Sequence, residues 1–273
     1  MRRRPALVIG STGKTGRRIV HRLTGLGHPV RGASRRSDPP FVWEEPSTWS
    51  EALRGAGSVY VSFFPDLAAP GAPTAIETLT SYAADAGVER LVLLSGRGEA
   101  NAQRCEEIVR ESGLTWTLIR TSWFSQNFTE GHLLPSVLEG VIALPAGDVA
   151  EPFVDADDIA DVAAAALTGD GHSGRLYELT GPRLLTFYEA AAEISKTAGH
   201  DVGYVPVTSE RFHAAVAQSA GSDYADLLTN LCAEVFDGRN ESLAHGVREA
   251  LGREPRDFTD FCRAAAASGV WTR

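Results

Sequence analysis

Lysine is almost absent from this chain of 273 residues, which contains only Lys14 and Lys196. The residues four positions before them are Gly10 and Ala192, so the sequence holds no Tyr-x-x-x-Lys pair. In that pair a tyrosine gives a proton to the reacting group, which is a common form of general acid catalysis. A reaction that depends on this proton donor is therefore excluded.

Cysteine is scarce as well, and the three cysteines share no Cys-x-x-Cys spacing. An odd number without that spacing favours a reducing cytoplasm, where Cys105, Cys232 and Cys262 would be ordinary packing residues. The seven histidines never form a pair with ligand-like spacing, so we predict no metal site.

Long apolar runs are missing too. No stretch could span a bilayer, and the basic cluster Arg2–Arg4 precedes an apolar segment too short for the core of a signal peptide. The formal net charge of −9 argues against sequence-independent binding to nucleic-acid phosphates. We expect a cytoplasmic protein, monomeric or homodimeric, whose partner is a small molecule rather than a nucleic acid or a membrane.

Three glycines spaced three apart follow the first apolar stretch, Ala6–Ile9, and an amphipathic pattern from Ile19 to Leu26 follows them. Strand, glycine turn and helix in this order form the first unit of a dinucleotide-binding fold. A pyrophosphate approaches the free N–H groups at the helix N-terminus, and a side chain at the closest turn positions would block it. A tight turn without a ligand is the alternative interpretation. The predicted cofactor loop comprises Gly10, Ser11, Thr12, Gly13, Lys14, Thr15 and Gly16.

The segment Gly13-Lys14-Thr15 also resembles part of the phosphate loop of nucleoside triphosphatases. That motif requires a glycine five residues before its second glycine, and Val8 occupies this position. An ATPase loop is therefore excluded.

The second predicted strand, around Pro29–Ala33, indicates which dinucleotide would bind. In NAD-binding folds an acidic residue at the end of this strand accepts hydrogen bonds from the ribose. Here no acidic residue occurs before Asp38, and the chain reads Ser34-Arg35-Arg36. A guanidinium group suits a phosphate, so we predict NADP, with Ser34 and Arg35 (or Arg36) on its 2′-phosphate. A solvated arginine pair in a loop is the alternative.

Further apolar stretches alternate with helical patterns, most regularly before Thr121. Parallel strands covered by helices on both faces give this rhythm, so we predict an α/β fold with a Rossmann-type doubly wound sheet. The later predicted strands are Phe41–Trp43, Ser58–Phe63, Arg90–Ser95, Thr115–Arg120 and Leu176–Leu179. Ligands of such sheets bind beyond the carboxyl ends of the strands. The candidate segments there are Gly10–Gly16, Phe63–Pro65, Ser95–Arg97 and Thr121–Phe128.

Beyond Val207 the sequence is mainly helical, which predicts a smaller C-terminal subdomain that caps the substrate site. Thr186 and Glu189 have the spacing of a capping box at the start of a helix. Asp155 and Asp158 are expected to be turn and helix-cap residues. We predict that residues 1–125 plus about 153–181 form the NADP-binding domain, and that about 126–152 and 182–273 form the substrate-binding subdomain.

With these residues placed, the chain resembles the NmrA-like, atypical branch of the short-chain dehydrogenase/reductase superfamily. That branch includes quinone reductases, triphenylmethane reductase and the festuclavine-type reductases of ergot alkaloid pathways. The similarity covers nearly the whole chain, and the ordered set of motifs is specific although the first one is widely shared. The matching segments are Val8–Arg17, Leu91–Ser95, Thr117–Arg120, Trp123–Phe124, Asn127–Phe128, Phe153–Asp155, Asp158–Ala160, Leu179–Pro182 and Tyr204–Val207.

The resemblance implies a Rossmann domain that binds NADPH, with the pyrophosphate on Ser11–Lys14. The residues that it places beside the adenosine and ribose are Phe63, Phe64 and Pro65, and those near the nicotinamide are Ser95, Gly96 and Arg97. The substrate pocket would be lined by Trp123, Phe124, Asn127 and Phe128. Trp123 and Phe124 would also suit an ordinary core between domains.

The missing Tyr-x-x-x-Lys pair of ordinary short-chain dehydrogenases argues against simple ketones, whose reduction needs a proton from a positioned acid. A quinone, an imine or iminium ion, or a related electron-poor aromatic compound has no such need, because solvent can protonate the product of hydride addition. Ser95 and Tyr60 could polarise a substrate oxygen, but neither has a base beside it in the sequence. The catalytic residue therefore stays unassigned.

Our leading hypothesis is an NADPH-dependent oxidoreductase of secondary metabolism that reduces a small electron-poor metabolite. Two other functions remain open on the same fold. A non-enzymatic redox sensor or regulator of the NmrA type would bind NADP(H) without consuming it. A biosynthetic cyclase, epimerase or dehydratase would retain NADP in an unchanged redox state.

Overall fold

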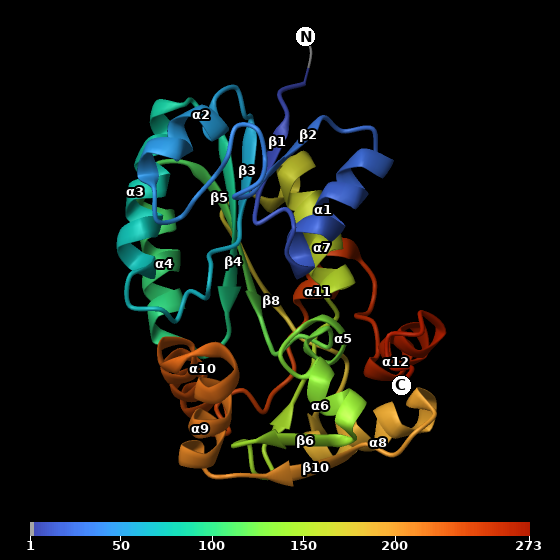
Figure 1. The fold of residues 1–273 in the computed structure, drawn as a ribbon. Coiled ribbons are helices and arrows are strands. Elements are labelled where there is room, and N and C mark those ends of the chain that lie inside the picture. Colours follow the sequence, from blue (N-terminus) through green and yellow to red (C-terminus); the bar gives the residue numbers. More distant parts are fainter. Residues whose placement is uncertain (1–2) are drawn as a thin grey trace.

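The computed structural model describes residues 3–273, so Arg2 of the basic cluster lies outside it. The centre of the protein is a six-stranded sheet in which every neighbouring pair of strands is parallel (Figure 1). In spatial order the strands are β2 (Val30–Ala33), β1 (Ala6–Ile9), β3 (Ser58–Val61), β4 (Arg90–Gly96), β5 (Thr115–Thr121) and β8 (Arg175–Leu179). β1 and β3 are buried along their whole length, as expected for strands covered on both faces. The predicted doubly wound sheet is confirmed.

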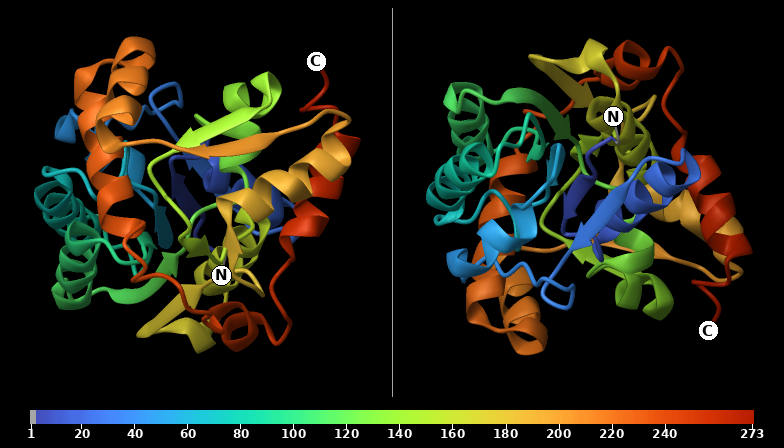
Figure 2. Two further views of the ribbon diagram at one scale, coloured as in Figure 1. Left: turned by 90° about the horizontal axis from the view of Figure 1, so that it is seen from below. Right: turned by 90° about the horizontal axis from the view of Figure 1, so that it is seen from above.

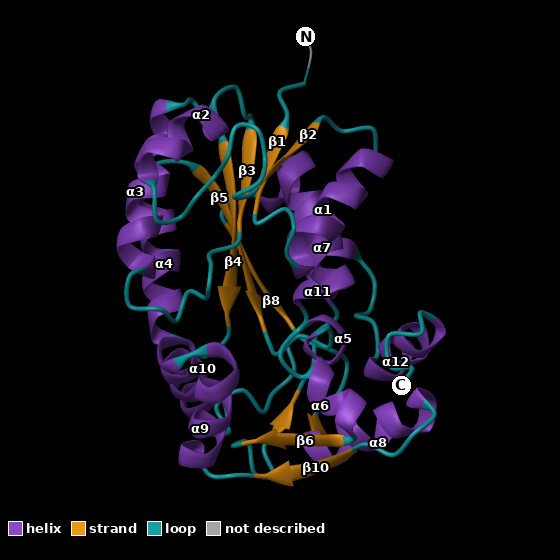
Figure 3. Ribbon diagram, viewed as in Figure 1, coloured by secondary structure: helices purple, strands orange, loops and turns teal. Residues whose placement is uncertain are grey.

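Helices cover both faces of this sheet (Figure 3). One layer contains α2 (Trp49–Leu53), α3 (Ala72–Asp85) and α4 (Ala100–Glu111), and the opposite layer contains α1 (Lys14–Gly25), α7 (Ala156–Thr168) and α11 (Gly246–Leu251). Short 3₁₀ turns occur at Pro46–Thr48 and Asp170–His172. The strand order reverses between β1 and β3, which opens a crevice at their carboxyl ends. No helix within residues 3–273 is long and apolar enough to cross a membrane.

The stretch Phe41–Trp43 is not a strand, so that prediction was wrong. The backbone groups of Val42 bond within the loop instead of to a neighbouring strand, and the Val42 carbonyl also accepts the Glu45 N–H at 3.1 Å. The Val42 N–H donates to the Thr48 hydroxyl at 3.1 Å, and its carbonyl accepts from the Trp49 indole at 2.7 Å. The Phe41 ring stacks on Trp49 with 5.5 Å between centroids. Side-chain hydrogen bonds and ring packing therefore replace the expected edge strand.

A smaller layer of structure lies beyond the carboxyl ends of the sheet. It contains two two-stranded sheets, formed by β6 (Val141–Leu144) with β10 (Gly203–Pro206) and by β7 (Ala150–Glu151) with β9 (Leu185–Thr186). Its helices are α5 (Asn127–Glu130), α6 (Leu134–Glu139), α8 (Phe187–Ala198), α9 (Ser209–Ala220), α10 (Ser222–Val235) and α12 (Phe258–Ala267). Figure 2, in its view from below, shows β6, β10 and α8 lying across this end of the sheet. The capping box of α8 is confirmed, because Thr186 and Glu189 each bond to the other's backbone N–H.

This layer has its own core, separate from the two cores of the sheet and rich in aromatic rings. Its largest fully buried rings are Phe128, Phe153, Phe187, Phe258 and Trp271. Cys232 and Cys262 are buried in this core, and Cys105 is buried in a core of the sheet. None of the three forms a disulfide, which confirms their expected packing role.

The carboxylate of Asp158, on α7, joins this C-terminal part to the sheet and is completely buried. It accepts the backbone N–H of Arg256 at 2.7 Å and pairs with Arg253 at 2.8 Å and with the Arg256 guanidinium. Asp158 is therefore an anchor for the segment between α11 and α12 rather than a helix cap. The cap of α7 is Asp155, as expected, which accepts the backbone N–H of Asp157 at 2.7 Å.

Replacing Asp158 with alanine should lower the free energy of unfolding by about 3 kcal/mol, because two arginines and a backbone N–H lose their acceptor. Asp170→Ala is the matched control, since the Asp170 side chain is fully exposed and its ion pair with Arg90 should contribute little. Urea unfolding followed by tryptophan fluorescence measures both variants. Equal losses would show that Asp158 does not anchor the C-terminal segment.

Candidate functional site

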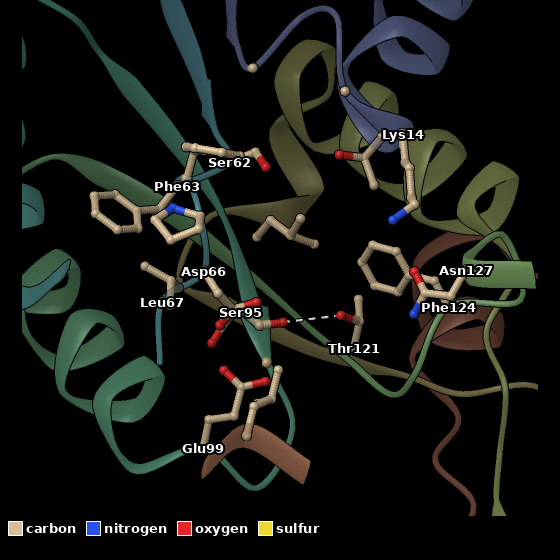
Figure 4. Close-up of a pocket in the computed structure, with 18 of the residues that line it drawn as sticks. Lys14, Ser62, Phe63, Asp66, Leu67, Ser95, Glu99, Thr121, Phe124 and Asn127 are labelled. Atoms are coloured by element: carbon tan, nitrogen blue, oxygen red, sulfur yellow. Dashed lines mark hydrogen bonds between the residues drawn. The ribbon is translucent and has the colours of Figure 1, made fainter. Parts of the chain in front are cut away.

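A cavity of about 620 Å³ lies beyond the carboxyl ends of β1 to β5, where the strand order reverses (Figure 4). Its walls come from the loops after these strands and from α10. The residues of our prediction that line it are Gly10, Thr12, Gly13, Lys14, Thr15, Ser34, Arg35, Phe63, Phe64, Pro65, Ser95, Gly96, Arg97, Trp123, Phe124 and Asn127. Those that do not line it are Ser11, Gly16, Tyr60 and Phe128. The fold thus brings segments from five strands to one space.

Close backbone approaches shape the glycine loop after β1. Gly10 has a φ of +79°, which favours glycine, and a Cβ on Gly16 would overlap the Gly10 carbonyl group. Gly16 therefore lets α1 pack against the loop from behind. Ser11 is directed toward β2, because its N–H and its hydroxyl both donate to the Ala33 carbonyl at 3.2 Å. The N-terminus of α1 has no side-chain cap within the described residues, so its first N–H groups are available to an anion.

Ser34 and Arg35 form the rim of the cavity at the end of β2. The Arg35 guanidinium lies 5.6 Å from the centroid of the Phe64 ring, a cation–π distance. Phe64 is 58% exposed and presents a flat open surface beside this positive charge. Arg36 does not line the cavity, which favours Arg35 of the two arginines as a ligand-binding group.

Lys14 projects into the cavity from the start of α1, toward Phe124 (Figure 4). Burial lowers the pKa of its amine; the charge of Glu130 opposes this effect, and the charges of Arg17 and Arg18 add to it. Glu130 itself pairs with both arginines. A poorly hydrated cation in this position favours an anionic partner.

The two hydroxyl groups that the sequence offered as substrate-polarising groups are engaged elsewhere. Tyr60 is fully buried, burial raises its pKa, and its hydroxyl donates to the Thr15 hydroxyl at 2.9 Å. Ser95 lines the cavity, but its hydroxyl donates to the Glu106 carboxylate at 2.7 Å, which Arg120 also binds. This geometry argues against Tyr60 and Ser95 as groups that act on a substrate.

Arg97 also lines the cavity, but its guanidinium holds the C-terminal segment. It pairs with Glu178 at 2.7 Å and donates to the carbonyls of Asn240 and Ser242 at 2.7 and 2.8 Å. The Asn240 amide returns a hydrogen bond to the Arg97 carbonyl at 3.2 Å. Arg97 is therefore a clamp between β4, β8 and the chain that follows α10.

The aromatic segment after β5 faces in two directions. Trp123, Phe124 and Asn127 line the cavity, whereas Phe128 is fully buried against Phe153 and Phe258 at 5.6 Å between centroids. The prediction of Phe128 as a substrate contact was therefore wrong. The chain turns into α5 here, so successive side chains point to different sides. Trp123 packs on Phe236 and reaches the cavity as well, which combines the two interpretations left open for it.

Sequence reasoning missed several residues of the cavity wall. These are Asp66, Glu99, His132, Glu151, Tyr224, Leu227, Leu228, Leu231, Val235 and Asn240. Asp66 and Glu99 follow the candidate segments Phe63–Pro65 and Ser95–Arg97 closely, and their proximity could have identified them. His132, Glu151 and the α10 residues belong to the smaller layer, whose placement over the sheet no local pattern indicates.

Asp66 and Glu99 form a carboxyl pair in the wall (Figure 4). Burial raises the pKa of both groups, and the negative charges of Asp66 and Glu234 raise that of Glu99 further. Both carboxyl groups are therefore shifted toward the protonated form. Gly96 makes this arrangement possible, because a Cβ there would overlap the Glu99 carboxyl group.

Four buried polar atoms in the cavity wall have no hydrogen-bond partner within residues 3–273. They are Glu99 Oε2, Trp123 Nε1, His132 Nε2 and Glu151 Oε1. Burial lowers the pKa of His132 to about 4 and raises that of Glu151 to about 8. Because an unmet buried group costs about 1–3 kcal/mol, four in one cavity indicate a site built for a ligand with polar atoms.

Comparison with known proteins places the chain among oxidoreductases. No family model matches it. It is 33% identical over 285 residues to the uncharacterized oxidoreductase YesF of Bacillus subtilis, covering 100% of this chain and 98% of that protein. It is 30% identical to the NAD(P)H azoreductase of Xenophilus azovorans (96% and 98% covered) and to the agroclavine dehydrogenase of Claviceps fusiformis (93% and 95%).

Solved structures show the same fold. Citrobacter sp. triphenylmethane reductase, complexed with NADP(H), superposes with a TM-score of 0.79 at 18% identity, covering 96% of this chain and 99% of that one. The NADPH-dependent quinone oxidoreductase QOR2 of Escherichia coli, complexed with NADPH, has a TM-score of 0.79 at 21% identity, with 95% and 99% covered. These similarities confirm the resemblance found in the sequence, and the chain belongs to the NmrA-like, atypical branch of the short-chain dehydrogenase/reductase superfamily.

Proposed function

We propose that this chain is an NADPH-dependent reductase that transfers hydride to a small electron-poor metabolite, such as a quinone, an imine or iminium ion, or a related aromatic compound. The observation that carries the proposal is a single cavity with two unlike ends. One end combines an uncapped helix N-terminus with Arg35, and the other is lined by aromatic and aliphatic side chains. Lys14 extends from the helix start toward Phe124.

The first end fits NADPH. The N–H groups at the start of α1 and the amine of Lys14 would hold the pyrophosphate, with Gly16 and Ser11 supporting the loop from behind. Ser34 and Arg35 would hold the 2′-phosphate, and the exposed Phe64 ring would flank the adenosine. When bound, NADPH supplies the hydride.

The second end would hold the substrate. Trp123 and Phe124 present rings to it, and α10 adds Leu227, Leu228 and Leu231. These side chains would orient a flat conjugated molecule and exclude water from the reacting atoms. The names azoreductase, triphenylmethane reductase and quinone oxidoreductase borne by the similar proteins support an acceptor of this kind.

We also propose that residues 1–125 plus about 153–181 bind NADP, and that the second set, about 126–152 and 182–273, binds the substrate. α11 falls within the second set, although it packs against β8 and α7. We also propose a cytoplasmic role in secondary metabolism, with the protein acting as a monomer or homodimer.

Arg35→Asp should raise the Kd for NADPH by roughly 10- to 100-fold and change that for NADH by less than about threefold, because only NADPH carries the 2′-phosphate. Fluorescence titration with each nucleotide measures both constants. Arg36→Asp is the matched control, because it makes the same change of charge at the next residue in the sequence, which does not line the cavity. Equal losses for both nucleotides, or a larger loss from the control, would contradict the assignment of Arg35.

The purified chain should oxidise NADPH faster than NADH in the presence of at least one member of a panel containing quinones, cyclic imines, triarylmethane dyes and azo dyes. The loss of reduced-nicotinamide absorbance measures turnover, and identical mixtures without protein correct for direct reduction. Tight NADPH binding without turnover of any acceptor would instead favour the sensor or the non-redox enzyme.

A further inference from the structure

Glu151 is a cavity-lining carboxyl group to which the reductase proposal gives no role. It ends β7, is only 1% exposed, and its Oε1 has no hydrogen-bond partner within residues 3–273. A buried carboxylate with a purely structural role is normally paired with a cation or surrounded by donors. Glu151 instead lines the cavity, where a bound ligand would supply the missing partner.

The surroundings of Glu151 favour a neutral carboxyl group. Burial is the main effect, and the charge of Glu241 acts in the same direction. The Trp123 backbone N–H and the Arg97 charge favour the ionised form, but Arg97 already pairs with Glu178 at 2.7 Å. The resulting pKa of about 8 keeps most of the group protonated at neutral pH.

Two other unpartnered atoms extend this polar surface across the same wall. Trp123 Nε1 offers a donor, and His132 Nε2 belongs to a ring 6.1 Å from the Trp123 ring. The low pKa of His132 keeps its imidazole neutral, so it adds no charge that would ionise Glu151 further. The wall at Trp123, His132 and Glu151 therefore offers one acidic proton and two neutral hydrogen-bonding groups. The nearby cation is the Lys14 amine, whose charge helps to lower the pKa of His132.

We propose that Glu151, rather than solvent as we expected from the sequence, is the proton donor for reduction of neutral substrates in this cavity, an inference that rests on the proposed reductase function. With a quinone, hydride addition forms one new bond, and its two electrons leave a negative charge on a substrate oxygen. The Glu151 O–H bond then breaks as an O–H bond forms on that oxygen, and water later returns a proton to the carboxylate. The substrate gains two electrons and two hydrogens, and the cofactor is oxidised.

The Asp66–Glu99 pair is the other protonated carboxyl site in the wall, but it suits the role less well. The negative charges of Asp66 and Glu234 raise the pKa of Glu99 well above its usual value, so this pair releases a proton less readily than a single carboxyl group does. For Glu151, the positive charge of Arg97 acts in the opposite direction. We therefore assign proton donation to Glu151.

Glu151→Gln tests the assignment, because it keeps the size and polarity of the side chain and removes the acidic proton. It should lower kcat for a quinone by about 100-fold or more, the usual effect of losing a general acid. Reduction of a triarylmethyl cation should change by less than about threefold, because hydride addition to a cationic carbon gives a neutral product without a proton. Glu139→Gln, an exposed position outside the cavity, should affect neither substrate.

The pH dependence supplies a second measure. Because the protonated form is active, wild-type kcat/KM for the quinone should fall as pH rises through about 8, and Glu151→Gln should lose this fall. Thermal unfolding gives a readout that does not depend on turnover. The folded state holds the Glu151 proton well above the ordinary pKa of 4.5, so wild-type stability relative to Glu151→Gln should decrease as pH rises from about 4.5 to 8.

Three results would overturn the proposal. The first is unchanged quinone turnover in Glu151→Gln, and the second is an equal loss with quinone and cation, which would indicate a structural role. The third is a stability difference from Glu151→Gln that does not vary with pH. Failure of the proposed function is distinct, because then the wild-type protein reduces neither substrate.

Discussion

The buried guanidinium of Arg97 is the contact on which the geometry of the candidate site most depends. It leaves the end of β4, crosses to Glu178 on β8 and holds the backbone of Asn240 and Ser242. The chain that follows α10 is thereby fixed to the sheet, and α10 supplies the aliphatic wall of the cavity. A charge buried in this way is stable only because every side of it meets an acceptor. The cavity exists as one space because this clamp holds its two halves together.

Within that space, apolar walls and acidic side chains act on each other. The aromatic and aliphatic lining removes water from Glu99, Asp66 and Glu151, and the loss of hydration raises the pKa of all three carboxyl groups. The same lining leaves several polar atoms without partners in the free protein. These atoms can form hydrogen bonds with a molecule that enters the site. Until then, leaving them unpaired lowers the stability of the folded protein.

The sheet and the glycine loop that follows its first strand could be predicted because their signals are local. The glycines of Gly10–Gly16 allow close backbone approach, and the strand before them is continuously apolar. Residues close together in sequence are therefore enough to predict this strand and its loop. The substrate side could not be predicted in the same way. Phe128 and Trp123 belong to one aromatic segment, and only the turn of α5 decides which of them enters the core. Phe41–Trp43 failed as a strand because Thr48 and Trp49 compete for its backbone, a contact that strand propensity does not describe.

The separate aromatic core of the smaller layer has a consequence for how such proteins diversify. The walls of the cavity rest on different cores, one beneath the glycine loop and one behind Trp123 and α10. Mutations that reshape the second core can alter which acceptor fits while leaving the nucleotide loop and its supporting sheet intact. The names of the similar proteins refer to azo compounds, an alkaloid and dyes. Such a range of substrates is expected if the second core varies among relatives while the first is retained.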